Sequence, residues 1–157
     1  MNDKIAKKIG EAHAFAAVCK ATKERVPSVF AEIFGSDVVS ELSDVCATQM
    51  SDLERIAEEA GMKETVTTKS TKTQEKIQAM AEQYVGDEWD DVAEVLEWMS
   101  FFVGGATAHW DVITGGGNAM QHTTLESVAK DGASYYQGLF EKVRAAGHAV
   151  GTARAAV

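Results

Sequence analysis

The chain has 157 residues, of which 45% are hydrophobic and 25% charged, which is typical of one globular domain. Fifteen Lys and Arg residues against 24 Asp and Glu residues give a net charge of −9, which argues against nucleic acid or an anionic membrane as a partner. The longest apolar stretch without a formal charge, 98–110, is too short to cross a bilayer. We therefore expect a cytoplasmic protein with a single domain over residues 1–157, its tail fraying from about residue 149.

The first half of the chain predicts two long helices. The first spans about Asp3 to Phe34, and Pro27 should kink or divide it near Val26 because proline cannot donate the helical hydrogen bond. The second begins with Ser36–Asp37 as its N-cap and ends at Gly61. Its apolar residues recur at steps of three and four: Val39, Leu42, Cys46, Met50, Leu53, Ile56 and Ala60.

Residues 63–73 are rich in Thr, Ser and Lys and lose the apolar period, so they are interpreted as a connection that leads into a short helix over about 73–85. A third long helix opens with the acidic run 87–91 and ends near Thr114, where the triplet Gly115–Gly117 stops it. The last helix starts with the capping-box spacing of Thr123 and Glu126.

No period-two run is present, so the fold class is all-α: four long helices form a bundle, and the short helix lies between long helices two and three. The short helix can carry the chain from one end of the bundle to the other as a crossover. In this topology His13, His109 and His122 lie toward the same end of the bundle, whereas an up-down-up-down bundle moves His109 and His122 to the end opposite His13.

With this crossover, and with helix two reading Gln49-Met50-Ser51-Asp52-Leu53-Glu54-Arg55-Ile56 before Gly61, the chain resembles the ferritin-like superfamily, in particular its rubrerythrin-type and stress-related members. The resemblance covers about residues 5–148 and implies a four-helix bundle. It also implies two irons or manganeses, held by one Glu from each of two helices and a Glu-x-x-His from each of the other two.

The sequence departs from that ligand pattern. Cys46 and Gln49 stand where helix two would place its Glu and His, and Gly132 and Tyr135 stand in the corresponding places of helix four. No Glu-x-x-His occurs in the chain. The resemblance therefore implies the fold and argues against the usual di-metal chemistry, so no cofactor is predicted.

The histidines offer an alternative metal site, because the three imidazoles of His13, His109 and His122 could bind zinc with one open position. A rearranged iron or manganese site of an oxidoreductase would use Glu94 or Glu97 with His109 or His13. For both metal sites a structural role is favoured, because histidines beside apolar stripes are more often hydrogen-bonded structural residues than metal ligands. The acidic stretches 37–60 and 87–97 are likewise interpreted as solvated helix faces and one helix cap.

Gly104 and Gly105 lie inside the third long helix, where each costs ~1 kcal/mol relative to Ala, so a close backbone approach is expected to offset that cost. This approach is either tight packing or space for a small ligand or cofactor beside Trp98, Phe102 and Trp110.

The two cysteines, Cys19 and Cys46, are too few for a disulfide framework and are expected to be free buried thiols at similar heights on the first helix pair. The sequence thus favours a non-catalytic binding or structural protein. The breadth of the aromatic surface around Phe101 predicts a homodimer. A metal-dependent oxidoreductase and a ligand-binding or cofactor-binding helical protein remain the alternatives.

Overall fold

A computed structural model describes residues 1–156. These residues form six α-helices and no strand, which confirms the all-α prediction. The helices are α1 (Asp3–Arg25), α2 (Pro27–Phe34), α3 (Ser36–Glu59), α4 (Lys63–Val85), α5 (Val92–Ala119) and α6 (Thr123–Ala155).

The first predicted helix is divided at the position that proline dictates. The helical hydrogen bonds of α1 end with the Val26 N–H donating to the Thr22 carbonyl, and Pro27 begins α2 at a position where no donor is needed. Gly35 (φ +88°) and Gly61 (φ +66°) then occupy positive-φ positions at either end of α3. The bounds predicted for this half of the chain are therefore confirmed, although Gly35 rather than Ser36 is the N-cap of α3.

The predicted connection over 63–73 is wrong, because these residues form the first half of the 23-residue helix α4. The buried positions of α4 do follow a helical stripe, but one of its members is polar. Ser70 is 3% exposed and bonds His13, whose Nδ1 lies 2.8 Å from the serine hydroxyl. A serine at a core position, among exposed threonines, hides the apolar period on which the prediction depended.

Two further helix boundaries differ from the predictions. Helix α5 continues through Gly115–Gly117 to Ala119, since Gly116 and Gly117 pack against Ile5 and Glu126 instead of turning the chain. Helix α6 continues to Ala155 rather than fraying from about residue 149. Its N-cap is His122, whose Nδ1 accepts from the Leu125 N–H at 3.2 Å, in place of the predicted Thr123.

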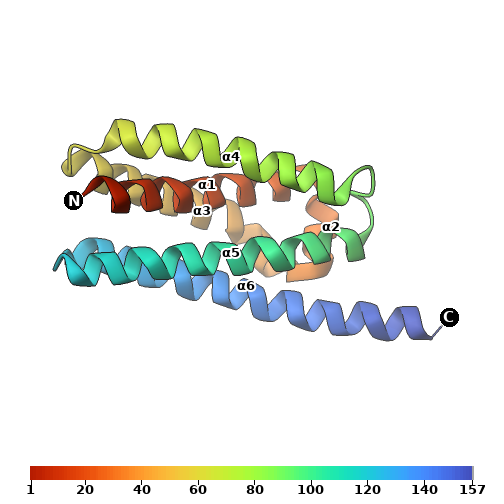
Figure 1. Ribbon diagram of the computed structural model, residues 1–157. Coiled ribbons are helices and arrows are strands. Elements are labelled where there is room, and N and C mark those ends of the chain that lie inside the picture. The colour runs from red at the N-terminus through yellow and green to blue at the C-terminus, as the bar shows by residue number, and fades with distance from the viewer. Residues whose placement is uncertain (157) are drawn as a thin grey trace.

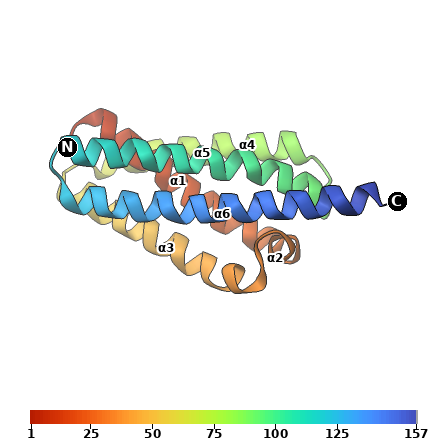
Figure 2. The same ribbon diagram turned by 90° about the horizontal axis from the view of Figure 1, so that it is seen from below.

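The long helices lie side by side, and each runs opposite to the one before it in the chain (Figure 1). Helices α3 and α5 consequently run in one direction, while α1, α4 and α6 run in the other (Figures 1 and 2). Helix α4 thus does carry the chain from one end of the bundle to the other, but as a full-length member that packs along α1. Helix α5 packs most extensively on α6.

Close backbone approach occurs at glycines other than those predicted. A Cβ on Gly10 of α1 would lie 2.6 Å from the Val66 carbonyl oxygen of α4, and one on Gly132 of α6 would overlap the Trp110 ring of α5. Trp110 is completely buried. These glycines lie in the two most extensive helix contacts, α1 with α4 and α5 with α6. None of the helices within residues 1–156 combines the length and apolarity that a membrane span requires.

Candidate functional site

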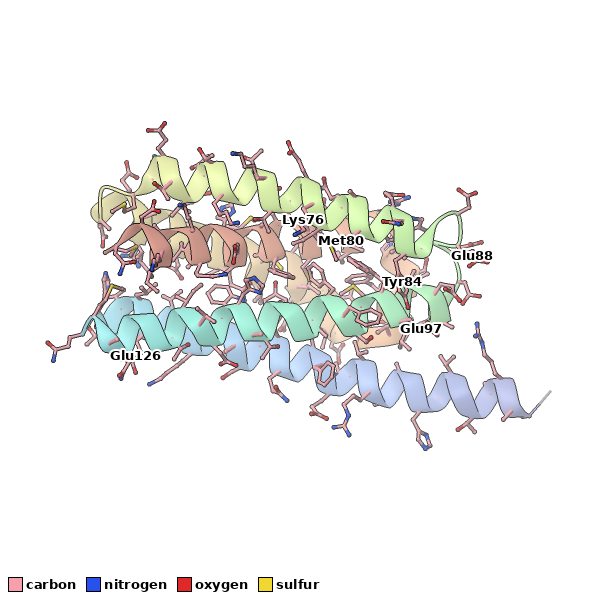
Figure 3. The ribbon with its side chains drawn as sticks, in the orientation of Figure 1. Lys76, Met80, Tyr84, Glu88, Glu97 and Glu126 are labelled. Atoms are coloured by element: carbon pink, nitrogen blue, oxygen red, sulfur yellow. The ribbon has the colours of Figure 1, made fainter. Side chains whose placement is uncertain are left out.

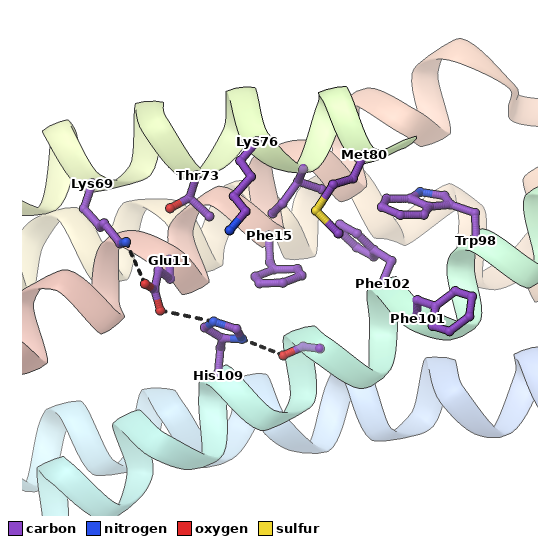
Figure 4. Close-up of a pocket in the computed structure, with 12 residues that line it drawn as sticks. Glu11, Phe15, Lys69, Thr73, Lys76, Met80, Trp98, Phe101, Phe102 and His109 are labelled. Atoms are coloured by element: carbon purple, nitrogen blue, oxygen red, sulfur yellow. Dashed lines mark hydrogen bonds and ion pairs between the residues drawn. The ribbon is translucent and has the colours of Figure 1, made fainter. Parts of the chain in front are cut away.

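A cavity of about 300 Å³ lies between α1, α4 and α5. Each helix contributes one face to it, with lining residues three, four or seven positions apart. The lining consists of Glu11 and Phe15 from α1, Lys69, Thr73, Lys76, Ile77 and Met80 from α4, and Trp98, Phe101, Phe102, Gly105 and His109 from α5. Charged and polar side chains gather at one end and aromatic side chains at the other (Figure 4). We call this cavity the α1–α4–α5 pocket.

Glu11 is the centre of the polar end. Its side chain is 12% exposed, and its carboxylate lies 2.9 Å from Lys69 Nζ, 2.7 Å from Lys8 Nζ and 3.1 Å from His109 Nε2. Burial alone raises the pKa of a carboxyl group, but the hydrogen bonds and charges of Lys8 and Lys69 outweigh it, so the pKa of Glu11 is lowered. Glu11 is therefore a carboxylate that is fully engaged by its neighbours.

His109 is held on both sides of its ring. Its Nδ1 lies 2.7 Å from the carbonyl oxygen of Gly105, which only accepts, so Nδ1 carries a proton and donates. Its Nε2 faces the Glu11 carboxylate, and its ring packs on Phe15 with 4.9 Å between the ring centroids. Both ring nitrogens of His109 therefore face oxygen acceptors, the Gly105 carbonyl on one side and the Glu11 carboxylate on the other.

Lys76 is the unpaired charge of the pocket. Its side chain points from α4 into the cavity between Thr73 and Phe15 (Figure 4). Among residues 1–156, no side chain forms an ion pair or hydrogen bond with its ammonium group. Lys69 and Lys76 thus stand against a single carboxylate, and the polar end of the pocket has an excess of positive charge.

Aromatic rings close the other end. The ring of Phe102 lies 5.1 Å from that of Phe15 and 6.2 Å from that of Trp98, measured between centroids. Phe102 and Trp98 are 3% and 4% exposed. The indole Nε1 of Trp98 is buried and has no hydrogen-bond partner among the described residues, so this apolar wall contains an unused donor.

Three of the five residues predicted to surround a small ligand lie on the wall of the α1–α4–α5 pocket. Trp98, Phe102 and Gly105 line the cavity, whereas Gly104 and Trp110 do not. No atom lies within 4 Å of a Cβ built on Gly104, so the close approach expected there is wrong, and at Gly105 the Phe15 ring is at an ordinary 3.5 Å. Trp110 belongs to the α5–α6 core instead.

Of the residues at the polar end of the pocket that can carry a charge, only His109 was a predicted site residue. Glu11 lies off the apolar stripe of α1, so the apolar pattern gives it no place between helices. Lys69 lies in the segment predicted as a connection, where no helix face is defined, whereas Lys76 lies inside the short helix predicted over 73–85. Their spacing of seven residues, with Thr73 between, is the helical signal that could have placed them on one face of α4.

The structure does not bring the three histidines together. His13 Nε2 lies 2.9 Å from Glu54 Oε1, His109 bonds Glu11 and Gly105, and His122 caps α6. Each ring therefore has its own partners on a different surface. Within residues 1–156 no three His, Cys, Asp or Glu side chains converge in a way that could hold a metal ion.

The alternative site that combined Glu94 or Glu97 with a histidine is not assembled either. Glu97 accepts from the Tyr84 hydroxyl at 3.2 Å, on the side of α5 that faces α4 (Figure 3). It is twelve residues from His109 on the same helix, a rise of ~18 Å. His13 faces α3 and α4, so these residues do not form one metal site.

The two thiols do meet, as their heights on α1 and α3 predict. Both are free and completely buried. The neighbouring Cys46 thiol and burial together raise the pKa of Cys19 well above its ordinary value. Burial also raises the pKa of the adjacent Tyr136, whereas the hydrogen bond with Cys19 lowers the pKa of Cys46, so the two thiols are not equivalent.

Comparison with known proteins adds no family to this description: no family model matches the chain, and no curated protein or solved structure is significantly similar to it. Its chemistry must be inferred from the geometry. The α1–α4–α5 pocket offers cations, hydrogen-bond donors and an aromatic wall, which is a set of groups suited to holding an organic anion.

Proposed function

We propose that the protein is a non-catalytic binding protein that holds a small organic carboxylate with an apolar body in the α1–α4–α5 pocket. The observation that carries the proposal is the unpaired ammonium of Lys76, directed into a cavity whose opposite wall is aromatic. A carboxylate beside Lys76 gains a charge-assisted hydrogen bond without breaking an existing ion pair.

The size and shape of the pocket restrict the ligand. A volume of about 300 Å³ lies at the lower end of the range for small-molecule sites, roughly 300–1,000 Å³. Met80, Ile77 and the rings of Phe15 and Phe102 can cover an alkyl chain or one ring system. Metabolites with several charges find only one positively charged end here, so monocarboxylates are the class that fits.

Isothermal titration calorimetry with octanoate, and with octan-1-ol as its uncharged analogue, tests the proposal. We expect octanoate to bind more tightly than the alcohol. Lys76→Gln should weaken octanoate binding by about tenfold, the scale of one charge-assisted hydrogen bond, while binding of the alcohol is unchanged.

Lys72→Gln is the matched control, because Lys72 lies one turn earlier on α4, has no ion pair among residues 1–156 and is outside the pocket. It removes the same charge but should leave octanoate binding within about twofold of wild type, since an exposed charge at a distance is screened by salt. Equal losses in the two variants, or no octanoate binding to the wild type, would contradict the proposal.

A second copy of the chain is the partner we propose for the apolar surface at the mouth of the pocket. Met80, Tyr84 and Phe101 are 49%, 42% and 64% exposed and line one groove between α4 and α5 (Met80 and Tyr84 in Figure 3, Phe101 in Figure 4). A dimer through this groove would cover the pocket from solvent. Sedimentation equilibrium should show a dimer that Phe101→Glu converts to a monomer; a wild-type monomer at 100 μM concentration rules the dimer out.

The ferritin-like relationship and the cytoplasmic location also stand as proposals. The parallel direction of α3 and α5, with α4 passing between the ends, supports the former. So does the position of Gln49, Gly132 and Tyr135, which the resemblance matches with metal ligands and which line one cleft. The two free buried thiols fit a reducing compartment.

A further inference from the structure

A second cleft lies between α3 and α6. It has a volume of about 380 Å³ and shares no lining residue with the α1–α4–α5 pocket. Its lining is Asp44, Val45, Thr48, Gln49 and Asp52 from α3 and Val128, Asp131, Gly132 and Tyr135 from α6. We call it the α3–α6 cleft.

The lining contains three carboxylates and no Lys, Arg or His. Asp52 has one partner, Arg55, at 3.5 Å on its own helix. Asp44 and Asp131 form no ion pair or hydrogen bond with any side chain in residues 1–156. The cleft is therefore negative, and two of its three charges are free to bind a cation.

Buried polar atoms at the base of the cleft also lack partners. Gln49 is only 8% exposed, and its Oε1 accepts no hydrogen bond in the described part of the chain. The Tyr135 hydroxyl beside the same cleft is buried and unpartnered as well. Burial raises the pKa of Tyr135, so its hydroxyl remains neutral and its oxygen can accept. Buried acceptors of this kind are normally satisfied, and an N–H donor in the cleft would satisfy them.

The arrangement of the carboxylates suits an extended cation better than a compact one. Asp44, Thr48 and Asp52 are spaced four residues apart on α3, so the two carboxylates begin ~12 Å apart along the helix. Within residues 1–156 no three ligands converge on one point as a metal ion requires. Between the charges, Val45, Val128 and Gly132 provide an apolar surface.

We propose that the α3–α6 cleft is a binding site for a linear polyamine. Terminal ammonium groups would pair with Asp44 at one position and with Asp52 or Asp131 at the other. Methylene spacers would lie on the two valines, and an N–H group would donate to Gln49 Oε1. The site goes beyond the proposed carboxylate pocket and is independent of it.

Calorimetric titration of the full chain with spermidine tests the site, with 1,4-diaminobutane and MgCl₂ titrated at the same ionic strength. We expect spermidine to bind more tightly than the shorter diamine, because only the longer chain spans the distance from Asp44 to Asp52. The double variant Asp44→Asn/Asp131→Asn should bind spermidine about five- to tenfold more weakly, the scale of two exposed ion pairs.

The matched control is Asp87→Asn/Glu88→Gln, which removes two charges from the α4–α5 loop, far from the cleft (Figure 3). It lowers the net negative charge equally and should leave binding within about twofold, because diffuse attraction is screened by salt. Equal losses in the two double variants, or Mg²⁺ binding as tightly as spermidine, would overturn the proposal.

Gln49→Met provides a second, uncharged test, since it removes the buried acceptor and keeps the length of the side chain. We expect weaker spermidine binding with an unchanged helical circular dichroism spectrum. Unchanged spermidine affinity in Gln49→Met would count against the cleft geometry. Octanoate binding to the α1–α4–α5 pocket should be unaffected by every one of these variants, so the two proposals fail separately.

Discussion

The α1–α4–α5 pocket and the α3–α6 cleft are two sites of similar size with opposite charge. The first has two lysines and a histidine around one carboxylate, and the second has three carboxylates and no basic residue. The net charge of −9 is thus a poor guide to what either site attracts. The electrostatics of each site depend on which helix faces meet there, because screening limits a charge to its neighbourhood.

The two sites also differ in how deeply their lining side chains are buried in the core. Phe102 of the pocket is 3% exposed, whereas Asp131 of the cleft is exposed. Changes to the pocket wall should therefore cost stability, and changes to the cleft rim should not. The following predictions test that contrast in order of decreasing effect.

Phe102→Ala should lower the free energy of unfolding by about 3–5 kcal/mol, because it leaves a cavity at the centre of the aromatic wall. Phe101→Ala, one residue away and 64% exposed, should cost less than about 1 kcal/mol, as should Asp131→Asn. Urea denaturation at a protein concentration where the chain is monomeric measures all three. A loss for Phe101→Ala as large as that for Phe102→Ala would show that the wall has been assigned to the wrong face.

Gly132→Ala should cost about 1–3 kcal/mol, since the added methyl group overlaps the buried Trp110 ring and forces α6 away from α5. Gly138→Ala on the same helix meets no atom within 4 Å and should stabilise by about 0.5–1 kcal/mol through helix propensity. Opposite shifts in melting temperature are expected. Gly132 also lines the α3–α6 cleft, so an unchanged melting temperature in Gly132→Ala would mean that the base of the cleft is not packed against the Trp110 ring.

Gly104→Ala and Gly105→Ala should each stabilise the protein by up to about 1 kcal/mol, because neither methyl group meets an atom closer than the Phe15 ring at 3.5 Å. Their effects on the pocket should differ. Gly105 lines it and Gly104 does not, so only Gly105→Ala should weaken octanoate binding. Calorimetry distinguishes the two, and equal weakening would place the ligand elsewhere.

Glu11 should make the polar end of the pocket sensitive to acid. Its lowered pKa means that, below the ordinary value of 4.5, the unfolded chain binds a proton before the folded chain does. The contribution of the Glu11 carboxylate to the free energy of unfolding is therefore fully present above pH 4.5. It declines as the pH falls below 4.5 toward the lowered pKa of Glu11. Glu11→Gln lacks this contribution at every pH. Urea unfolding should show a wild-type advantage that shrinks between pH 5 and pH 3; a constant difference would contradict it.

Helices with a clear apolar period or a proline or glycine boundary were predictable from the sequence, and the helix segment without such a signal was not. The break at Pro27 and the ends at Gly35 and Gly61 were predictable, because proline lacks a donor and glycine accepts a positive φ. The first half of α4 was not predictable, because a polar residue, Ser70, occupies one of its buried positions. Ser70 bonds His13, which is 57 residues away in the chain and which no local pattern identifies as its partner. Trp98 and Phe102 at the aromatic end of the pocket were among the predicted site residues, as was His109 at the polar end. Lys69 was not, because it lies in the half of α4 that was predicted as a connection.

The sequence by itself determined that this chain is helical, where its first helices break, and that its aromatic residues gather on one stretch of α5. These are consequences of local backbone chemistry and of helical period. Only the tertiary structure decided that α4 is a full-length helix and that Glu11 contacts Lys69 and His109. It also decided that Gly10 and Gly132, but not Gly104, lie where a neighbouring helix leaves no room for a Cβ atom. Such contacts join residues far apart in the chain, so they depend on how the helices pack.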